Sequence, residues 1–209
     1  MRTRLSRVLV LAGATILCAG GCGGSGGGSE PSDTTITINS TPTVDGTVVD
    51  TVLVDTSTFA LQVGDTSGNS RKRGFLRFSL ASIPAGATIG SAVLRVHQSF
   101  VFGTPYASLG NVVVDHMRIG SALDLGDFET PAVVVGTLSS DATLGHKTLD
   151  VTSSVVADLA AALANTDFRL RASLLDTDSD GVADDSQWND AEDTAGDGNV
   201  PRLVVTYSP

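Results

Sequence analysis

A run of aspartates between residues 176 and 184 has the spacing of a metal-binding loop. Three aspartates occupy alternate positions, a glycine follows the third, and a further aspartate stands three residues after that glycine. Alternate carboxylates in a tight loop converge on one hard cation, and glycine permits the sharp turn that this requires. The spacing therefore predicts a calcium site. Its predicted ligands are Asp176, Asp178, Asp180, the backbone carbonyl of Val182, and Asp184.

The surroundings of this loop indicate the kind of calcium site. Position 12 is Gln187 instead of the bidentate glutamate of an EF-hand, and a strand pattern precedes the loop. From Asp176 to Asp197 there are eight Asp, one Glu and no Lys or Arg, so the carboxylates repel one another without a cation. We expect a structural calcium ion, in a loop that resembles those of extracellular repeat proteins. A solvated, disordered acidic loop is the alternative. Further ligands could come from Asp185, Asp190, Glu192 and Asp193.

Aromatic side chains that could stack on a sugar ring are few. Sugar sites place an aromatic face against the ring and use polar groups to bind its hydroxyls. Trp188, the single Trp, lies in the acidic segment, and Tyr106 lies on an expected loop. Both are candidate ligand contacts. The alternatives are that Trp188 covers the core and that Tyr106 anchors a turn.

Arg71, Lys72 and Arg73 form the one basic cluster of an acidic chain. A planar guanidinium binds a carboxylate through two parallel hydrogen bonds. Arg71 and Arg73, together with Arg77 and Arg95, could therefore bind the uronate groups of an acidic polysaccharide. The alternative is a solvated turn whose positive charges offset nearby acids.

Composition limits the classes of function. The chain has 209 residues, 13 Lys and Arg against 23 Asp and Glu, and a net charge of −10. This balance argues against a nucleic-acid partner, because phosphate binding needs clustered positive charge. Two cysteines cannot build a disulfide scaffold or a four-cysteine zinc site. We find no nucleophile elbow, H-E-x-x-H motif or phosphate-binding glycine loop, and we predict that the protein is not an enzyme.

Short strands must position these residues. From Thr34 onward β-branched runs alternate with turn residues, and Leu76 and Phe78 alternate with Arg77, which predicts one buried and one solvent-facing side. The regular spacing predicts an antiparallel β-sandwich formed by residues 33–209 as one domain. Thr152–Asn165 has the pattern of one short helix that ends at Asn165. The expected strands are Thr34–Ile38, Thr47–Val54, Thr58–Val63, Gly74–Leu80, Ser91–Phe100, Asn111–Ile119, Ala132–Leu138, His146–Val151, Phe168–Leu175 and Arg202–Tyr207.

The first residues have the pattern of a signal for export. Arg2, Arg4 and Arg7 precede an apolar stretch, Val8–Ala19, that is too short to span a bilayer. Small residues then lead to Cys22 and resemble a bacterial lipobox, in which the cysteine is acylated and becomes the new N-terminus. A plain secretory signal is the alternative. We expect a signal peptide at 1–21, lipidation at Cys22 and a flexible Gly/Ser-rich tether at 22–32.

Three segments of the chain resemble the DNRLRE domain family. Arg73–Val96 reads RGFLRFSLASIPAGATIGSAVLRV and is similar to that family's LLRFDLSSLPAGATI stretch. Leu149–Val155 and Asn199–Tyr207 are similar to its DVT run and its closing PRLVVTY strand. The resemblance implies a jelly-roll β-sandwich. It also implies carbohydrate binding, because the family overlaps a class of carbohydrate-binding modules that recognises alginate-like, acidic polysaccharides. Asp190 departs from the family, in which Ser is usual at this position.

These patterns together predict a lipid-anchored surface protein. We expect a non-catalytic, calcium-stabilised β-sandwich of the bacterial cell envelope that binds polysaccharide. We expect the protein to contact the membrane through its lipid anchor alone. In a Gram-negative bacterium the expected location is the outer membrane or the cell surface. One alternative is a structural or adhesive surface protein without a sugar site. A polysaccharide lyase or hydrolase is a further alternative.

Overall fold

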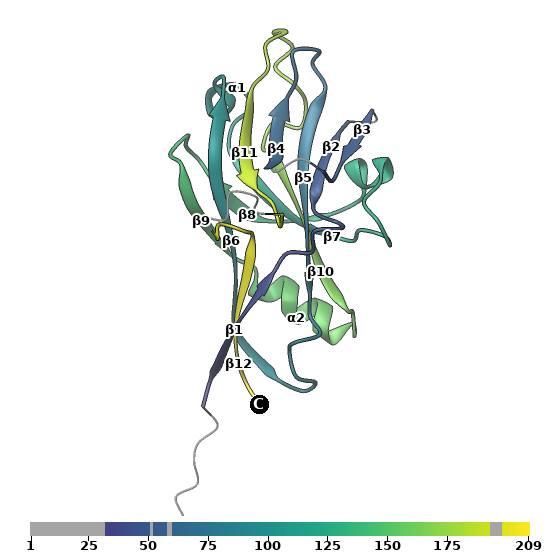
Figure 1. Cartoon of the computed structure of the whole chain (residues 1–209), viewed down its shortest axis with the longest axis vertical. Helices are drawn as coiled ribbons and strands as arrows, with labels where there is room; N and C mark the ends of the chain where they lie inside the picture. The colour runs from purple at the N-terminus through teal and green to yellow at the C-terminus, as the bar shows by residue number, and fades with distance from the viewer. Residues whose placement is uncertain (1–31, 51, 58–59, 193–197) are drawn as a thin grey trace, which may run out of the picture. The chain divides into compact units, whose positions relative to one another are not determined.

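The computed structural model describes residues 32–50, 52–57, 60–192 and 198–209, and its elements lie in the compact unit Pro31–Pro209 (Figure 1). The predicted signal peptide, Cys22 and all but the last residue of the predicted tether lie outside the described residues. The strands pair in antiparallel fashion, which confirms the predicted all-β class. They are β1 (Thr34–Asn39), β2 (Gly46–Val49), β3 (Leu53–Asp55), β4 (Ala60–Asp65), β5 (Arg71–Ser79), β6 (Thr88–Phe102), β7 (Val112–Met117), β8 (Val133–Ser139), β9 (Gly145–Asp150), β10 (Asn165–Ala172), β11 (Asp185–Asn189) and β12 (Arg202–Ser208).

Strand β6 is central to the first layer of the sheet. Ala92, Leu94 and Val96 are buried, while the side chains between them are partly exposed, as in a strand with one face on a core. β12 pairs with the first part of β6, β11 with its last part and β9 with its middle. β1 pairs with β12, and β4 pairs with β11. Figure 1 shows β6, β11 and β4 side by side.

The second layer consists of β5, β10, β7 and β8, and β2 with β3 extends it beside β5. β4 pairs with β11 and also with the start of β5, so one curled sheet supplies both layers. Apolar side chains from the two layers meet in the main core. The first layer contributes Leu94, Trp188 and Leu203, and the second contributes Phe78 and Phe168. This arrangement confirms the predicted sandwich-like fold.

Both faces of β5 are buried, although the sequence predicted a solvent-facing side. Phe78 packs in the main core, whereas Phe75 belongs to a second apolar cluster with Phe128. Arg77 is also buried and pairs with Asp167 at 2.7 Å. Phe128 belongs to the 3-10 helix η1 (Leu125–Glu129), which no sequence pattern indicated. The segment that contains η1 therefore covers the face of β5 that the alternation predicted to be exposed to solvent.

One short helix lies where the sequence predicted it. α2 spans Thr152–Ala160 and contacts β6 and β10. Helix α2 ends before the predicted stop at Asn165 because Ala162 has a left-handed φ of 55°. Asn165 is already the first residue of β10, where it pairs with Ser79 of β5. A one-turn helix, α1 (Pro105–Ser108), follows β6. Within the described ranges, no helix has the length and apolar character needed to span a bilayer.

Strand β11 is present in the structure, but the sequence patterns did not predict it. Its residues Asp185–Asn189 lie between β6 and β4 and pair with both strands. The segment that the sequence analysis treated as one acidic loop thus contains an internal strand. Ser186 and Trp188 are buried and alternate with Gln187 and Asn189, which are only partly covered, while Asp185 at the start of the strand is also buried.

Candidate metal centre and ligand-binding surfaces

Three aspartates of the predicted calcium loop lie together just before β11. One carboxylate oxygen from each of Asp178, Asp180 and Asp184 lies within 4.8 Å of the others. Ser179 and Gly181 have left-handed φ angles of 62° and 76°, which turn the chain between these carboxylates. The fold therefore brings together three of the predicted ligands.

Asp184 is the buried member of this cluster. Its Oδ2 accepts a hydrogen bond of 2.7 Å from Ser108 Oγ, and its Oδ1 accepts one from the Thr104 N–H. A Cβ on Gly103 would clash with Asp184 Oδ1, so this close approach requires glycine. The segment after β6 and the acidic loop are held together at this one carboxylate.

Asp65, the last residue of β4, is a further carboxylate that lies against the backbone of Asp184. It is fully buried, and its Oδ1 accepts a hydrogen bond of 3.0 Å from the Asp184 N–H. Its Oδ2 has no hydrogen-bond partner in the described part of the chain. Burial raises the pKa of Asp65, the Asp184 N–H lowers it, and the charges of Asp178, Asp184 and Asp180 raise it. Sequence reasoning missed Asp65 because 119 positions separate it from Asp184.

The two other predicted ligands of the loop are Asp176, which does not belong to this carboxylate cluster, and the Val182 carbonyl. Asp176 is exposed, and its Oδ1 accepts the N–H of Thr177 at 2.9 Å. The side chain of Val182 is exposed, and its N–H donates to Asp180 Oδ1 at 2.7 Å. Coordination by the Val182 carbonyl stays a prediction.

Two of the carboxylates that could have completed the shell, Asp185 and Asp190, have other surroundings. Asp185 is buried and pairs with Lys72 at 2.6 Å. Asp190 lies just beyond the other end of β11, where burial and the charge of Glu192 raise its pKa to about 6. Asp193 lies outside the described residues.

The two predicted aromatic ligand contacts have different environments. Trp188 is fully buried in the main core, and its Nε1 donates to Ser186 Oγ at 3.0 Å. Its ring is therefore unavailable to a sugar, and the prediction that it contacts a ligand is wrong. Tyr106 is partly buried against the core, and its hydroxyl donates to Gln98 Oε1. Burial raises the pKa of Tyr106, which agrees with an anchoring role.

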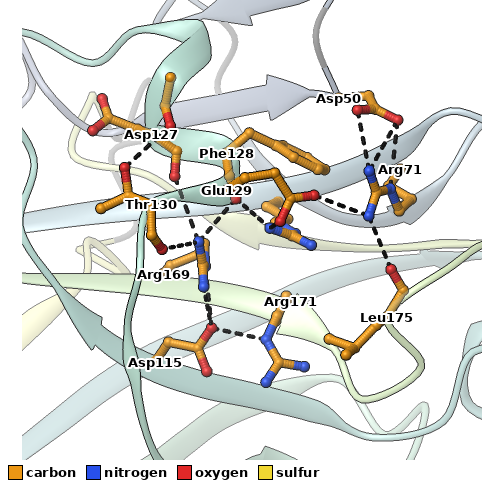
Figure 2. Close-up of polar contacts among 12 residues, drawn as sticks. Asp50, Arg71, Asp115, Asp127, Phe128, Glu129, Thr130, Arg169, Arg171 and Leu175 are labelled. Carbon is orange, nitrogen blue, oxygen red and sulfur yellow. Dashed lines mark hydrogen bonds and ion pairs between the residues drawn. The ribbon is translucent and has the colours of Figure 1, made fainter.

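Arg71 is held by groups of the protein itself. It pairs with Asp50 at 3.2 Å and with Glu129 at 3.0 Å, and it donates to the Leu175 carbonyl at 3.1 Å (Figure 2). The hollow beside it has a cavity volume of about 10 Å³. This volume holds about one water molecule, so no sugar ring enters the hollow.

Arg73 is buried in the same network. It is 4% exposed, pairs with Glu129 at 3.2 Å, and lies 4.0 Å from the centroid of the Phe128 ring. Burial and the charge of Arg169 both lower its pKa. Arg169 in turn pairs with Asp115 at 2.7 Å (Figure 2). Arg73 therefore supports the fold, and the prediction that it binds a ligand is wrong.

A β-bulge creates an exposed aromatic pair at the end of β6. Gln98 pairs with Trp188, but Phe100 pairs with Gln187, so one extra residue stands between the two pairs. Cross-strand partners share a face of a sheet. Because Trp188 faces the core, its neighbour Gln187 faces outward, and so does Phe100. Phe102 follows on the same side, and both phenylalanines are 50% exposed.

Basic side chains continue the outward face of β6. Arg95 lies opposite Arg202 of β12, and the rings of His97 and His146 are 4.9 Å apart. His97 Nδ1 lies 3.3 Å from Asn189 Oδ1. Burial lowers the pKa of His146, and the charges of Arg95, His97 and Arg202 lower it further. No ion pair involves Arg95 or Arg202 within the residues that the structure describes.

We call the outward side chains Arg95, His97, Phe100 and Phe102 the β6 surface. Sequence reasoning named Arg95 as a possible uronate contact, but it placed Phe100 and Phe102 near a probable loop and gave them no ligand-binding role. The signal was two phenylalanines at alternate positions near a strand end, which is also the pattern of core residues. No protein-family model matches the chain, and no curated protein is significantly similar to it.

Proposed function

We propose that the chain is a non-catalytic module of the cell envelope that binds an acidic polysaccharide on the β6 surface. The observation that carries the proposal is the half-exposed pair Phe100 and Phe102, placed on the same sheet face as the basic side chains Arg95 and Arg202. Contiguous exposed apolar groups with a polar rim mark interaction sites.

Each part of this surface suits one part of an acidic sugar chain. Side chains two residues apart on a strand are about 7 Å apart, so Phe100 and Phe102 offer neighbouring apolar faces for sugar rings. The Gln187 amide, opposite Phe100, can donate to and accept from hydroxyls. The guanidinium groups of Arg95 and Arg202 suit carboxylates, which they can bind through two parallel hydrogen bonds.

The envelope location rests on the lipobox-like end at Cys22. Acyl chains on this cysteine would anchor the module, and the Gly/Ser-rich tether would separate the sandwich from the membrane surface. The resemblance to the DNRLRE family agrees with a carbohydrate-binding sandwich. Calcium, in this proposal, is a structural ion of the acidic loop.

A structural or adhesive surface protein is the second candidate. It is favoured by the buried Trp188 and by the pairing of Arg71 and Arg73 with groups of the chain itself. Under this candidate the β6 surface would contact protein, and no polysaccharide would bind.

The test uses residues 30–209, which include every described strand. We expect this protein to bind alginate or another uronate polymer on a glycan array, without forming unsaturated products or new reducing ends. Phe100→Ala combined with Phe102→Ala should weaken the binding at least 10-fold. Val133→Ala, which shortens a 70% exposed side chain on β8, is the matched control and should bind like the parent.

Two results would overturn the proposal. The first is the absence of binding to all acidic and neutral polysaccharides, which would leave the adhesive candidate. The second is polysaccharide binding that the double phenylalanine variant retains at parental strength, because the β6 surface would then not be the site.

A further inference from the structure

We propose that one end of the sandwich, formed by α2 and the connection between β5 and β6, docks on the surface of the lipid bilayer. We call residues 80–89 and 156–164, which form this end, the basal surface. The proposal rests on the lipid anchor at Cys22, which belongs to the proposed function. It adds to that function the side of the protein that faces the membrane.

Two apolar hollows lie on the basal surface. Their cavity volumes are about 360 Å³ and about 380 Å³, and both are lined by Gly86, Ala87 and Leu159. Val156 is exposed at the second hollow, and Leu163 is only partly buried at the first. Contiguous exposed apolar groups of this kind mark an interaction surface, which here lies between two separate segments of the chain.

A tight turn forms the rim of the basal surface. The Ala87 N–H donates to the Pro84 carbonyl at 3.1 Å, and Gly86 has a φ of 85°, as the third position of a type II turn requires. Pro84 and Ala85 are exposed on this turn. Because the closed turn and the proline limit the freedom of the backbone, contact with a partner costs little conformational entropy.

The basal surface lacks the acidic character of the whole chain. Residues 80–90 contain no charged side chain, and residues 151–166 contain only Asp158. Asp158 is fully buried and pairs with His116 at 2.9 Å and with Arg118 at 2.8 Å. The chain has 23 Asp and Glu against 13 Lys and Arg, and anionic lipids repel negative charge. An apolar face without exposed carboxylates therefore approaches a bilayer at a low electrostatic cost.

The chain enters the sandwich at the same end. Thr34, the first residue of β1, pairs with Tyr207 of β12, which in turn pairs with Ile89 of β6. Figure 1 shows the start of β1, helix α2 and the connection between β5 and β6 at one end of the sandwich. Strand β6 has 15 residues and ends at Phe102, so its two ends are up to about 45 Å apart. Docking at the basal surface would thus leave the phenylalanine pair far from the membrane.

The length of chain between Cys22 and β1 suits this contact. Residues 22–33 include five Gly and three Ser, and a Gly/Ser-rich chain of this length spans on average about 20 Å. Such a short linker gives an effective concentration of about 1 mM or more for a contact at its far end. A weak affinity for lipid is therefore enough to hold the basal surface on the bilayer, although the linker also permits separation.

The test attaches residues 22–209 to vesicles and measures which end contacts lipid. Cys22 is the one cysteine in this part of the chain, so coupling it to a maleimide-bearing lipid supplies an anchor that does not depend on acylation in cells. Val156→Trp places a reporter on the basal surface, and Leu174→Trp is the matched control, because both positions are 44% exposed. Leu174 lies just beyond the end of β10, whereas α2 precedes the start of this strand.

We expect phosphatidylcholine with brominated acyl chains to quench the Val156→Trp reporter about 2-fold, because an interfacial apolar face inserts about 5–10 Å. The Leu174→Trp reporter should not be quenched. Trp188 is fully buried, and its emission is measured in the parent and subtracted. Adding Ala85→Asp and Ala160→Asp to Val156→Trp places carboxylates at two exposed positions and should abolish the quenching while the circular dichroism spectrum stays unchanged.

Four results would overturn the docking surface. They are no quenching of Val156→Trp, equal quenching of both reporters, quenching that the two added carboxylates leave unchanged, and a concentration-dependent blue shift of Val156→Trp without vesicles. The last result would show that a second copy of the chain covers the surface. Polysaccharide binding is measured on residues 30–209 without lipid, so its loss would refute the proposed function and the loss of quenching would refute the docking surface.

Discussion

Replacing Asp45 with Asn should remove a pH dependence from the stability of the fold. Asp45 is 1% exposed, and its Oδ1 accepts a hydrogen bond of 3.1 Å from the Arg77 N–H. Burial raises its pKa from 3.8 to about 8; the nearby Ser40 hydroxyl and the hydrogen bond from the Arg77 N–H lower it, and the charges of Glu192 and Asp190 raise it. An Asn side chain has nearly the same shape, can accept the same N–H, and never becomes charged.

The sign and the size of the effect follow from the two pKa values. Between about pH 4 and pH 8 the folded state keeps the Asp45 proton, whereas the unfolded state has lost it. The unfolded state then binds fewer protons, so the free energy of unfolding decreases as the pH rises. The decrease is about 1.4 kcal/mol per pH unit, or about 3 kcal/mol from pH 5 to pH 7.

Urea denaturation at pH 5, 6, 7 and 8 in constant calcium measures this difference directly. The stability of Asp45→Asn relative to the parent should rise steadily from pH 5 to pH 7. Asp141→Asn is the control, because a hydrogen bond from Lys147 lowers the pKa of Asp141 to about 2, so it stays charged throughout this range. Parallel stability curves for the parent and Asp45→Asn would refute the reasoning.

Two further predictions concern the core and the anchor. Trp188→Ala should lower the free energy of unfolding by about 3–5 kcal/mol, because it leaves a large cavity in the main core. Urea denaturation measures this loss, and a change below about 1 kcal/mol would contradict the position of Trp188. Cys22→Ser should abolish the incorporation of a fatty-acid probe in expressing cells, and unchanged labelling would argue against the lipobox.

The fold class follows from local patterns, but the environment of each strand face does not. Leu76 and Phe78 alternate with Arg77, and the alternation correctly places Leu76 and Phe78 in the main core. It wrongly places Arg77 in water, because the partner that buries its charge, Asp167, is 90 residues away in β10. Such partners arise from strand pairing across the sheet, and no periodicity in β5 contains them.

The candidate site also has a part that the sequence predicts, the contacts within one loop, and a part that it does not predict, the contacts between distant strands. Asp178, Asp180 and Asp184 belong to one loop, so their spacing alone predicts that their carboxylates converge. Asp65 meets the Asp184 backbone only because β4 pairs with β11. The sequence pattern places Trp188 in the acidic loop because the polar residues around it hide the short strand that carries it into the core.

The phenylalanine pair shows how one residue can determine a surface. In a regular strand Phe100 would face the same side as Gln98, which is fully buried. The bulge opposite Gln187 and Trp188 adds one residue to β6 and reverses the alternation beyond it. Two phenylalanines are thereby moved to the outward face at the cost of hydrophobic burial. That cost is understandable if the outward face binds a ligand, and this links the local bulge to the proposed polysaccharide site.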